Sequence, residues 1–405
     1  MNTFDEHKLA LYGGKPVRDI FLPFSRPTFD REEEKEIIDT LHSGWVTKGP
    51  KTKLFEEKFK EFTGAKYAVA VSSCTAALHL SLMAIGIRPK DEIITTPFTF
   101  PSTANVIEYM GAKPVFVDIE EDTFNIAPKQ IEKAITYNTK AIILVHFAGH
   151  PCEMDKILYL AKKYNLFVIE DAAHALGSKY CGRKVGNIGD LTCFSFYPTK
   201  LITTGEGGMV TTDRREFARK IEILSSCGIS STAWRRSTDK IYKPWDTLFL
   251  GYKYNMSDLQ ASLGLVQLKK IEEFLRIRKR YVQMYNKVFS KFPEIITPII
   301  RKGILSAYHL YVIKLKIEDL TIKRNMLVDA LRAENIGVGV HFKPLHLHSY
   351  YRKKYGFKKR DFPIAEDVFE RVISLPLYSA MSEKDVKDVI LAVKKVVSYY
   401  RKRKW

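Results

Sequence analysis

Short apolar runs alternate with segments of helical periodicity between residues 66 and 213. The runs KYAVAVS, DEIITTP, KPVFVDI, AIILVHF and LFVIEDA are rich in Val and Ile, and stretches with apolar residues every three to four positions follow the first four runs. Nearly continuous apolar strands are typical of a sheet that is covered on both faces. The pattern therefore predicts an α/β unit in which helices sandwich a mostly parallel sheet with right-handed crossovers. Ligands of such a sheet bind at the carboxyl ends of its strands.

The pattern changes after residue 190. The runs DLTCFSFY and GGMVTTD are separated by a glycine-rich turn without a helical segment, which indicates an interruption of the sheet. A helical stretch near 257–288 leads to a strand in HLYVIKL, a helix in IKRNMLVDALRAEN, a strand in GVGVHF and a last helix in SEKDVKDVILAVKKVVSYY. These elements predict a smaller C-terminal α+β domain. We assign residues 1–270 to the large domain, with the N-terminal segment, and residues 271–405 to the small domain.

Composition narrows the class of protein. The chain has 405 residues, 45% of them hydrophobic, which is enough for a large core. No segment reaches the roughly 18 apolar residues of a membrane span, and the N-terminus lacks the apolar core of a leader. The cysteines lack the spacing of a zinc or redox site, which favours a reducing compartment and no metal. We expect a soluble, unprocessed cytoplasmic protein. The five cysteines are Cys74, Cys152, Cys181, Cys193 and Cys227.

The net charge of +19 attracts nucleic acid, anionic lipid and phosphorylated substrates alike. Much of the excess lies in helical patterns such as KKIEEFLRIRKRY and the tail KKVVSYYRKRKW, which are typical of a solvated surface. No helix-turn-helix, zinc or RNP signature occurs, so we expect no specific nucleic-acid partner. A weak contact of the basic tail with a membrane surface stays open.

A carboxylate and a lysine occupy two positions that fit one cofactor. Asp171 ends the run LFVIEDA, and Lys200 follows 29 residues later in FSFYPTKLITTGEGG. A carboxylate at a strand end can pair with the pyridine nitrogen of pyridoxal phosphate, and a lysine amine can form the Schiff base. Taken alone, an Asp in this place is more often a helix cap, and a lone lysine is usually exposed.

A third segment, VSSCTAAL, joins a strand to a helix that begins near Cys74 or Thr75. Free amides and the dipole at such an N-terminus bind phosphate, and the hydroxyls of Ser72, Ser73 and Thr75 can add to them. By itself the segment also fits an ordinary helix cap. Neither GxGxxG nor GxxxxGK[ST] occurs, which removes the main support for a dinucleotide site or a P-loop.

Taken together, these motifs resemble a known family. VSSCTAALHLSLMAIG, ITTPFTFPSTANVI, KPVFVDI, VIEDAAHALGS, FSFYPTKLITTGEGGMV and GYKYNMSDLQASLGLVQL, in this order, resemble the DegT class (DegT/DnrJ/StrS) of sugar aminotransferases, with the type I fold of aspartate aminotransferase. The resemblance extends from SGWVTKGP to VISLPLYSAM, and order and spacing match together. It implies a pyridoxal 5'-phosphate enzyme that moves an amino group from an amino acid, commonly glutamate, to a keto sugar on a nucleotide. A 4-keto-6-deoxyhexose on UDP or dTDP, used for cell-surface polysaccharide, lipid or glycoprotein synthesis, is the implied substrate.

The resemblance also implies roles for single residues. Lys200 would carry the cofactor and shuttle the proton, and Asp171 would pair with the ring nitrogen. Phe100 in PFTF would stack on the ring, and His174 in EDAAH would lie near its phenolic oxygen. The cofactor phosphate would be lined by Cys74 through its amide, by Thr75, by Ser195 and, from the neighbouring subunit of a homodimer, by Asn255 in GYKYNMSD.

The substrate side is less distinct in the sequence. SGWVTKGP would place Trp45, Thr47 and Lys48 near the mouth of the pocket, and GVGVHF would bring His341 from the small domain. Arg235 and Arg236, in the inserted-looking stretch STAWRRSTDK, could bind a diphosphate with two hydrogen bonds each. Each of these residues also fits a purely structural or surface role.

Two alternatives stay open at this point. Sugar dehydratases resemble this class but carry histidine in place of the lysine, and the presence of Lys200 argues against them. The other alternative is a protein of this fold that regulates or binds nucleic acid without catalysis, to which the basic charge would contribute. Such a protein would be colourless after purification.

Overall fold

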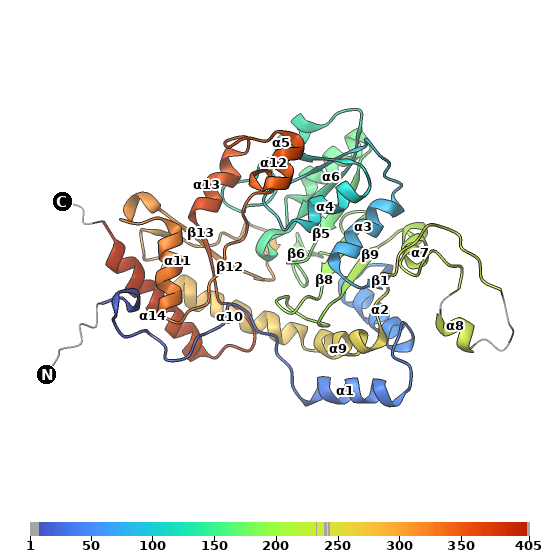
Figure 1. Cartoon of the computed structure of the whole chain (residues 1–405), viewed down its shortest axis with the longest axis horizontal. Helices are drawn as coiled ribbons and strands as arrows, with labels where there is room; N and C mark the ends of the chain where they lie inside the picture. Colours follow the sequence, from blue (N-terminus) through green and yellow to red (C-terminus); the bar gives the residue numbers. More distant parts are fainter. Residues whose placement is uncertain (1–7, 232, 239–240, 242–243, 403–405) are drawn as a thin grey trace.

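In the computed structural model, which describes residues 8–231, 233–238, 241 and 244–402, a seven-stranded sheet forms the centre of a large α/β unit (Figure 1). Strand β9 is antiparallel to both of its neighbours, and the other neighbouring pairs are parallel. The expected mostly parallel sheet is confirmed, and the interruption after residue 190 is this antiparallel strand. The strand order is β1 (Tyr67–Val71), β9 (Gly208–Thr212), β8 (Leu191–Ser195), β5 (Phe167–Asp171), β4 (Thr139–Val145), β2 (Glu92–Thr95) and β3 (Lys113–Phe116).

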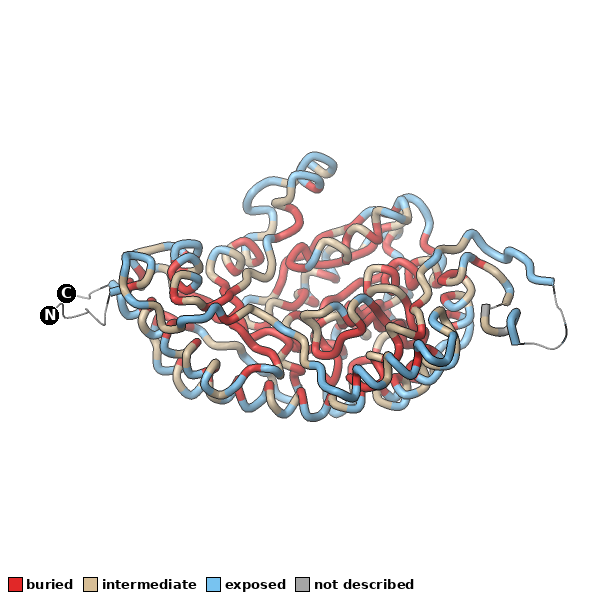
Figure 2. The backbone as a smooth tube through the Cα atoms, turned by 60° about the horizontal axis from the view of Figure 1, so that its bottom comes forward, coloured by how far each residue is buried: buried red, intermediate tan, exposed pale blue. Residues whose placement is uncertain are grey.

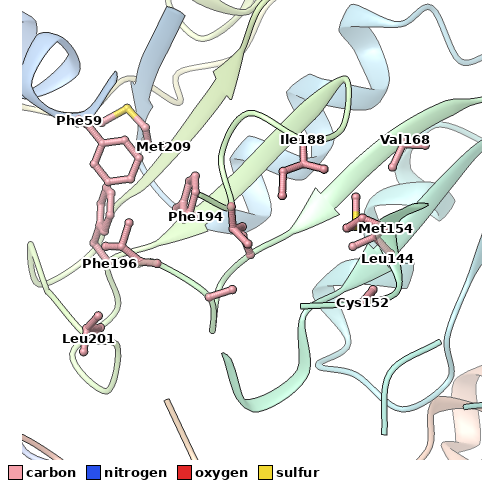
Figure 3. Close-up of a cluster of buried hydrophobic side chains, with 14 of the residues drawn as sticks. Phe59, Leu144, Cys152, Met154, Val168, Ile188, Phe194, Phe196, Leu201 and Met209 are labelled. Atoms are coloured by element: carbon pink, nitrogen blue, oxygen red, sulfur yellow. The ribbon is translucent and has the colours of Figure 1, made fainter. Parts of the chain in front are cut away.

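Helices cover both faces of this sheet. The helices in this part of the chain are α1 (Arg31–His42), α2 (Pro50–Thr63), α3 (Cys74–Ala84), α4 (Ser102–Tyr109), α5 (Pro128–Ala134), α6 (Met154–Tyr164), α7 (Arg215–Leu224) and α9 (Asp258–Lys269), with α8 (Ala233–Thr238) apart from the sheet. Successive strand residues point to opposite faces. Ile142 and Leu144 of β4 join a buried cluster with α2, α6 and α9, part of which Figure 3 shows. Ala141 and Ile143 join a second cluster with α3, α4 and α7.

The C-terminal part contains a smaller antiparallel sheet of order β10 (Ile295–Ile296), β12 (Tyr311–Leu315) and β13 (Val372–Leu375). Its helices are α10 (Ile271–Phe289), α11 (Arg324–Ala333), α12 (Ser349–Tyr355), α13 (Pro363–Arg371) and α14 (Glu383–Tyr400). The helical stretch expected near 257–288 consists of α9 and α10, which meet at Lys270. β12, α11 and α14 confirm three further expected elements.

The strand expected in GVGVHF does not form. Gly339 pairs with Ser374 of β13 in an isolated bridge, and Ile336 pairs with Leu22 in another. A Cβ atom at Gly337 would lie 2.7 Å from the carbonyl oxygen of Leu22, so the N-terminal segment packs directly on this backbone. The segment therefore forms one isolated bridge with the N-terminal segment and one with β13, and it forms a continuous ladder with neither.

The two parts of the chain meet along several segments. Leu9 and Leu22 of the N-terminal segment are buried in the C-terminal hydrophobic cluster. A small sheet of order β11 (Ile304–Leu305), β6 (Lys179–Tyr180) and β7 (Arg183–Lys184) joins the C-terminal part to the large unit. The domain boundary at residue 270 stays a prediction. Short 3₁₀ turns are η1 (Ala10–Tyr12), η2 (Phe147–Gly149), η3 (Ile317–Asp319) and η4 (Leu345–Leu347).

Buried residues run through the middle of the molecule, and the outer helices carry the exposed positions (Figure 2). The five cysteines are all unpaired. Within the described part of the chain, no helix is long and apolar enough to cross a membrane. The cytoplasmic location stays a prediction.

Candidate active site

A cavity of about 490 Å³ lies where β4, β5 and β8 end, between the large unit, the N-terminal segment and the C-terminal part. This is the edge of the sheet at which the topology predicts a ligand. Nine of the residues singled out in the sequence line it together, from segments far apart in the chain. They are Ser73, Cys74, Thr75, Phe100, Asp171, His174, Ser195, Lys200 and His341.

Lys200 lies on the loop that joins β8 to β9. The loop is closed at its base by hydrogen bonds from Phe196 N to Gly207 O (2.9 Å) and from Thr204 N to Phe196 O (3.0 Å). The backbone amide of Lys200 donates to the carbonyl of Tyr197 at 2.8 Å. Burial lowers the pKa of the Lys200 amine, an effect that Cys74 and Asp171 offset only in part. A larger share of this amine is therefore neutral, and hence nucleophilic, than of an exposed lysine.

Asp171 is the last residue of β5 and is buried. One carboxylate oxygen accepts a hydrogen bond from the Thr103 hydroxyl at 2.8 Å, and the other accepts the amide of Ala173 at 3.2 Å. Burial raises the pKa of Asp171, while Thr103, Ala173 and Lys200 act in the opposite direction. The sequence reasoning missed Thr103, although a hydroxyl one turn after PFTF, at the start of a helix, was a usable signal.

The turn into α3 forms a cradle of backbone amides. The helix begins at Cys74, and the side chain of Ser73 caps it by accepting the amide of Ala76 at 3.1 Å. No acceptor within the described residues receives the amides of Cys74 and Thr75. β9 runs so close that a Cβ atom at Gly208 would lie 2.5 Å from the carbonyl carbon of Ser73 and 2.7 Å from the nitrogen of Cys74. Free amides at a helix N-terminus suit a phosphate group.

Aromatic and imidazole rings form part of the remaining walls. Phe100 is 61% exposed and lies 6.4 Å from Phe342 between ring centroids. Nδ1 of His174 accepts the amide of Ala148 at 3.4 Å, which places the imidazole proton on Nε2. Burial, with Lys200 and His341, lowers the pKa of His174. Burial and Lys200 lower the pKa of His341 to about 4, and its Nδ1 pairs with the Ser374 hydroxyl at 2.8 Å. Cavity residues that the sequence reasoning missed include Phe24, Ser25, Thr99, His309 and Phe342.

The loop SGWVTKGP does not line this cavity. The Asp258 carboxylate at the start of α9 accepts the amides of Gly49 (2.8 Å), Lys51 (3.0 Å) and Thr52 (2.9 Å), and the amide of Asp258 donates to Thr47 O at 3.2 Å. We call this set of bonds the Asp258 clasp. Trp45 packs edge-on against Trp234 at 4.8 Å. The Lys48 ammonium is buried 3.6 Å from Glu56. Within one chain, Thr47 is therefore held on α9, Trp45 on α8 and Lys48 on α2, and the place of these residues near a pocket mouth stays a prediction.

Asn255 also lies outside the cavity lining. Its backbone pairs with Val71, and its Oδ1 is buried without a partner among the described residues. A buried oxygen without a donor is costly, so this side chain is incomplete in a single chain. Arg235 belongs to α8, but its side chain lies outside the described part of the structure. The exposed Arg236 donates to Ser231 O at 2.6 Å and lies 5.7 Å from the Trp245 ring.

The segment that carries α8 leaves the body of the protein as a long excursion, visible at the right of Figure 1. Backbone bridges Ile229–Thr247 and Ser226–Lys253 close its base. The excursion therefore begins and ends at one place, directly before Tyr254 and Asn255.

Comparison with known proteins finds relatives over nearly the whole chain. The chain is 49% identical over 381 residues to the spore coat polysaccharide biosynthesis protein SpsC of Bacillus subtilis, covering 94% of this chain and 98% of SpsC. Spr1654 of Streptococcus pneumoniae, a proposed sugar aminotransferase, is 35% identical in its PMP-form, with a TM-score of 0.87 and coverage of 93% and 99%. Its PLP-form matches with a TM-score of 0.86. DesI, solved in the presence of its TDP-sugar product, is 28% identical, with a TM-score of 0.86 and coverage of 97% and 98%.

The resemblance inferred from the sequence is thus confirmed for the family, the fold and the class of enzyme. Four of the six motifs that suggested it contribute residues to the cavity. Residues 27–394 match the family profile, and the chain belongs to the DegT/DnrJ/EryC1/StrS aminotransferase family.

Proposed function

We propose that this enzyme transfers an amino group from an amino acid, glutamate in the first instance, to the keto group of a nucleotide-linked sugar, with pyridoxal 5'-phosphate bound in the cavity. The observation that carries the proposal is the position of Lys200 and Asp171 in the wall of one cavity, beside the free amides at the start of α3. The donor set matches the cofactor. It offers a nucleophilic amine, a buried carboxylate and a phosphate cradle.

Each part of the cofactor has a counterpart in the chain. The amides of Cys74 and Thr75 and the hydroxyl of Ser195 would hold the phosphate. Asp171, fixed by Thr103, would keep the pyridine nitrogen protonated. When bound, the cofactor supplies an electron sink for the charge that develops at the donor's Cα.

The side chains around the ring have distinct tasks. Phe100 would cover one face of the ring and exclude water from it. His174, with its proton on Nε2, can donate to the ring's phenolic oxygen. Lys200 Nζ, once released from the cofactor, would take the proton from the donor's Cα and deliver it to the cofactor's side of the site, then run the same transfer backwards for the keto sugar. The lowered pKa of Lys200 suits this work, because a neutral amine is needed to accept a proton.

The substrate class is supported by the relatives. We propose a keto sugar carried by UDP or dTDP, with a 4-keto-6-deoxyhexose as the first candidate, because DesI is solved with a TDP-sugar product and SpsC serves spore coat polysaccharide biosynthesis. A panel of keto sugar nucleotides incubated with glutamate, with product masses measured, tests this directly. The expected product is heavier than the keto substrate by about one mass unit, because transamination replaces C=O by CH–NH₂. No aminated product from any member of the panel would contradict the proposal.

A direct test of the cofactor does not need the substrate. The purified enzyme should absorb near the visible edge, and borohydride reduction followed by peptide mass spectrometry should find the pyridoxyl group on Lys200. A colourless protein that binds no pyridoxal phosphate would instead favour the alternative of a non-catalytic member of the fold.

We further propose a homodimer in which Asn255 completes the phosphate site of the neighbouring subunit. The unpartnered Oδ1 of Asn255 and its place outside its own cavity support this. Mixing Lys200→Ala with an Asn255→Ala variant tests it, since a mixed dimer holds one doubly damaged site and one intact site. Activity should return to at most roughly a quarter of wild type when subunits exchange at random. Confirmed exchange without any recovery would show that Asn255 acts within its own subunit.

A further inference from the structure

Two histidines from different parts of the chain stack in the wall of the cavity. His174 follows β5, and His309 precedes β12. Their ring centroids lie 4.3 Å apart at an interplanar angle of 32°. Both residues line the cavity, and Nδ1 of the buried His309 has no hydrogen-bond partner among the described residues. Within the chain, the clearest contact of the His309 ring is thus the ring of His174.

The backbone beside His309 is strained. Tyr308 has a φ of +48°, a left-handed conformation that is unfavourable for a bulky side chain. Ala148, whose amide donates to His174, also has a positive φ of +56°, and its carbonyl accepts the amide of Leu310 at 3.4 Å. Strained residues of this kind persist where the surroundings hold them firmly, and they gather at functional sites. Here they bring the two histidine-bearing segments together.

A buried arginine donates hydrogen bonds to the backbone carbonyls of this strained turn. Arg278 of α10 is 2% exposed, and its Nη1 donates to the carbonyls of Leu377 (2.8 Å), His309 (3.2 Å) and Tyr308 (3.3 Å). Among the described residues, Arg278 forms no ion pair with a carboxylate, and its Nε has no hydrogen-bond partner. Burial lowers its pKa to about 10, so the charge is kept at neutral pH. A buried charge without a counter-ion is costly, so its presence under the cavity points to a task beyond packing.

We infer that His309, fixed by Arg278, is a positioning residue that holds the His174 ring in the orientation from which Nε2 donates into the cavity. The inference rests on the proposed cofactor site. Stacking on His309 restricts rotation of the His174 ring, while the Ala148 amide fixes its tautomer. A protonated His174 could not accept that amide, and burial beside Lys200, Arg278 and His341 keeps both imidazoles neutral.

The visible absorbance of the bound cofactor, followed against pH, tests this without measuring turnover. His174→Gln should shift the midpoint of that titration by about one pH unit, because it weakens a hydrogen bond to the ring oxygen. His309→Ala and Arg278→Met should shift it in the same direction by about half as much or more. The double variant His174→Gln/His309→Ala should shift it no further than His174→Gln alone, since His309 acts through His174.

Two further variants separate positioning from general loosening. His309→Phe keeps a stacking ring without nitrogens and should restore a nearly wild-type midpoint. Arg324→Met removes another buried arginine of the C-terminal part, with an Nε that is likewise unpartnered, and should leave the midpoint unchanged even if it lowers stability. If Arg278→Met does not fold, the three His309 variants decide the question.

Three results would overturn the inference. They are a wild-type midpoint in His309→Ala, additive shifts in the double variant, or an equal shift in Arg324→Met. A wild-type protein that binds no cofactor would overturn the proposed function and this inference together. Normal cofactor binding with an unshifted His309→Ala overturns the inference alone.

Discussion

Two groups of residues that the family resemblance assigns to one site lie in different places in the single chain. Those at the ends of the strands line the cavity, and those on the loops beside α9 lie outside it. Asp171 and Lys200 follow the central strands and lie in one cavity. Trp45, Lys48 and Asn255 lie outside it, although the same resemblance assigns them to the same site. The Asp258 clasp fixes the loop of Trp45 and Lys48 to the start of α9, directly after the loop that carries Asn255.

This difference shows which part of the site one chain forms by itself. The carboxyl edge of a parallel sheet collects residues by topology, so a single chain is sufficient to form that part of the site. The loops beside α9 are rigidly held but leave the Asn255 oxygen and the Lys48 ammonium buried without hydrogen-bond partners in the described chain. A buried oxygen without a donor gains most from a second molecule, which is why we propose that Asn255 acts in a neighbouring subunit, whereas the Lys48 ammonium already lies 3.6 Å from Glu56.

The largest effect is expected at Lys200. Among the described residues, Lys200 is the only lysine that lines the cavity, so in Lys200→Ala activity should fall by at least about 10³-fold and the cofactor absorbance should disappear. Absorbance spectra and product masses measure both effects. Lys314→Ala is the control, because Lys314 is also buried but pairs with Glu121 outside the cavity. Retained transamination in Lys200→Ala would remove the cavity from the mechanism.

A smaller loss is expected at Asp171. Asp171→Asn keeps the shape but not the charge, and turnover should fall by roughly 10²-fold while cofactor binding survives in part. Steady-state kinetics and cofactor titration separate the two. Asp118→Asn is a matched change, since Asp118 is a buried aspartate that caps α13 through the amides of Ile364 and Ala365. Near-normal turnover in Asp171→Asn would contradict its role.

A weaker effect is expected at Gly208. A methyl group there would meet the Ser73–Cys74 peptide, so Gly208→Ala should push β9 away from the cradle and weaken cofactor binding by about tenfold. Equilibrium titration of the apoenzyme measures this. Gly264→Ala places a similar clash against Phe55, remote from the cavity, and should lower stability without changing cofactor affinity. Equal affinities in all three proteins would show that the phosphate binds elsewhere.

The smallest effect is expected on the excursion. Arg236→Ala removes an exposed cation, so KM for the nucleotide sugar should rise by about two- to fivefold with kcat unchanged, and the change should vanish at high salt. Arg219→Ala, another exposed arginine, serves as the control and should change nothing. An unchanged KM in Arg236→Ala at low salt would place the diphosphate away from this side chain.

The elements of the large unit were predictable because their signal is local. Strands buried on both faces, such as β4 and β5, leave continuous apolar runs, and the helix between them has clear periodicity. GVGVHF was misread because its alternation is that of a strand, whereas its actual neighbours, Leu22 and Ser374, come from two distant segments. Pairing with residues that are distant in the sequence cannot be predicted from the local pattern of apolar and polar positions.

The site shows the same limit. Asp171, Lys200 and the start of α3 could be recognised from spacing and family resemblance. His309 and Arg278 could not, because their significance lies in a contact between two parts of the fold and in a charge without a counter-ion. Neither the ring contact of His309 nor the unpaired charge of Arg278 can be recognised from a sequence motif. Thr103 lies between these cases, since its distance along the chain from PFTF is short but its bond to Asp171 spans 68 residues.

The closed base of the excursion has a consequence for engineering. Since the bridges Ile229–Thr247 and Ser226–Lys253 fix both of its ends, the chain between Ile229 and Thr247 can change in length and composition without displacing Asn255. We therefore expect that the excursion can be replaced as a unit between Ile229 and Thr247. Segments from related enzymes could be grafted at these two residues to test the contact with the nucleotide sugar that we expect for Arg236.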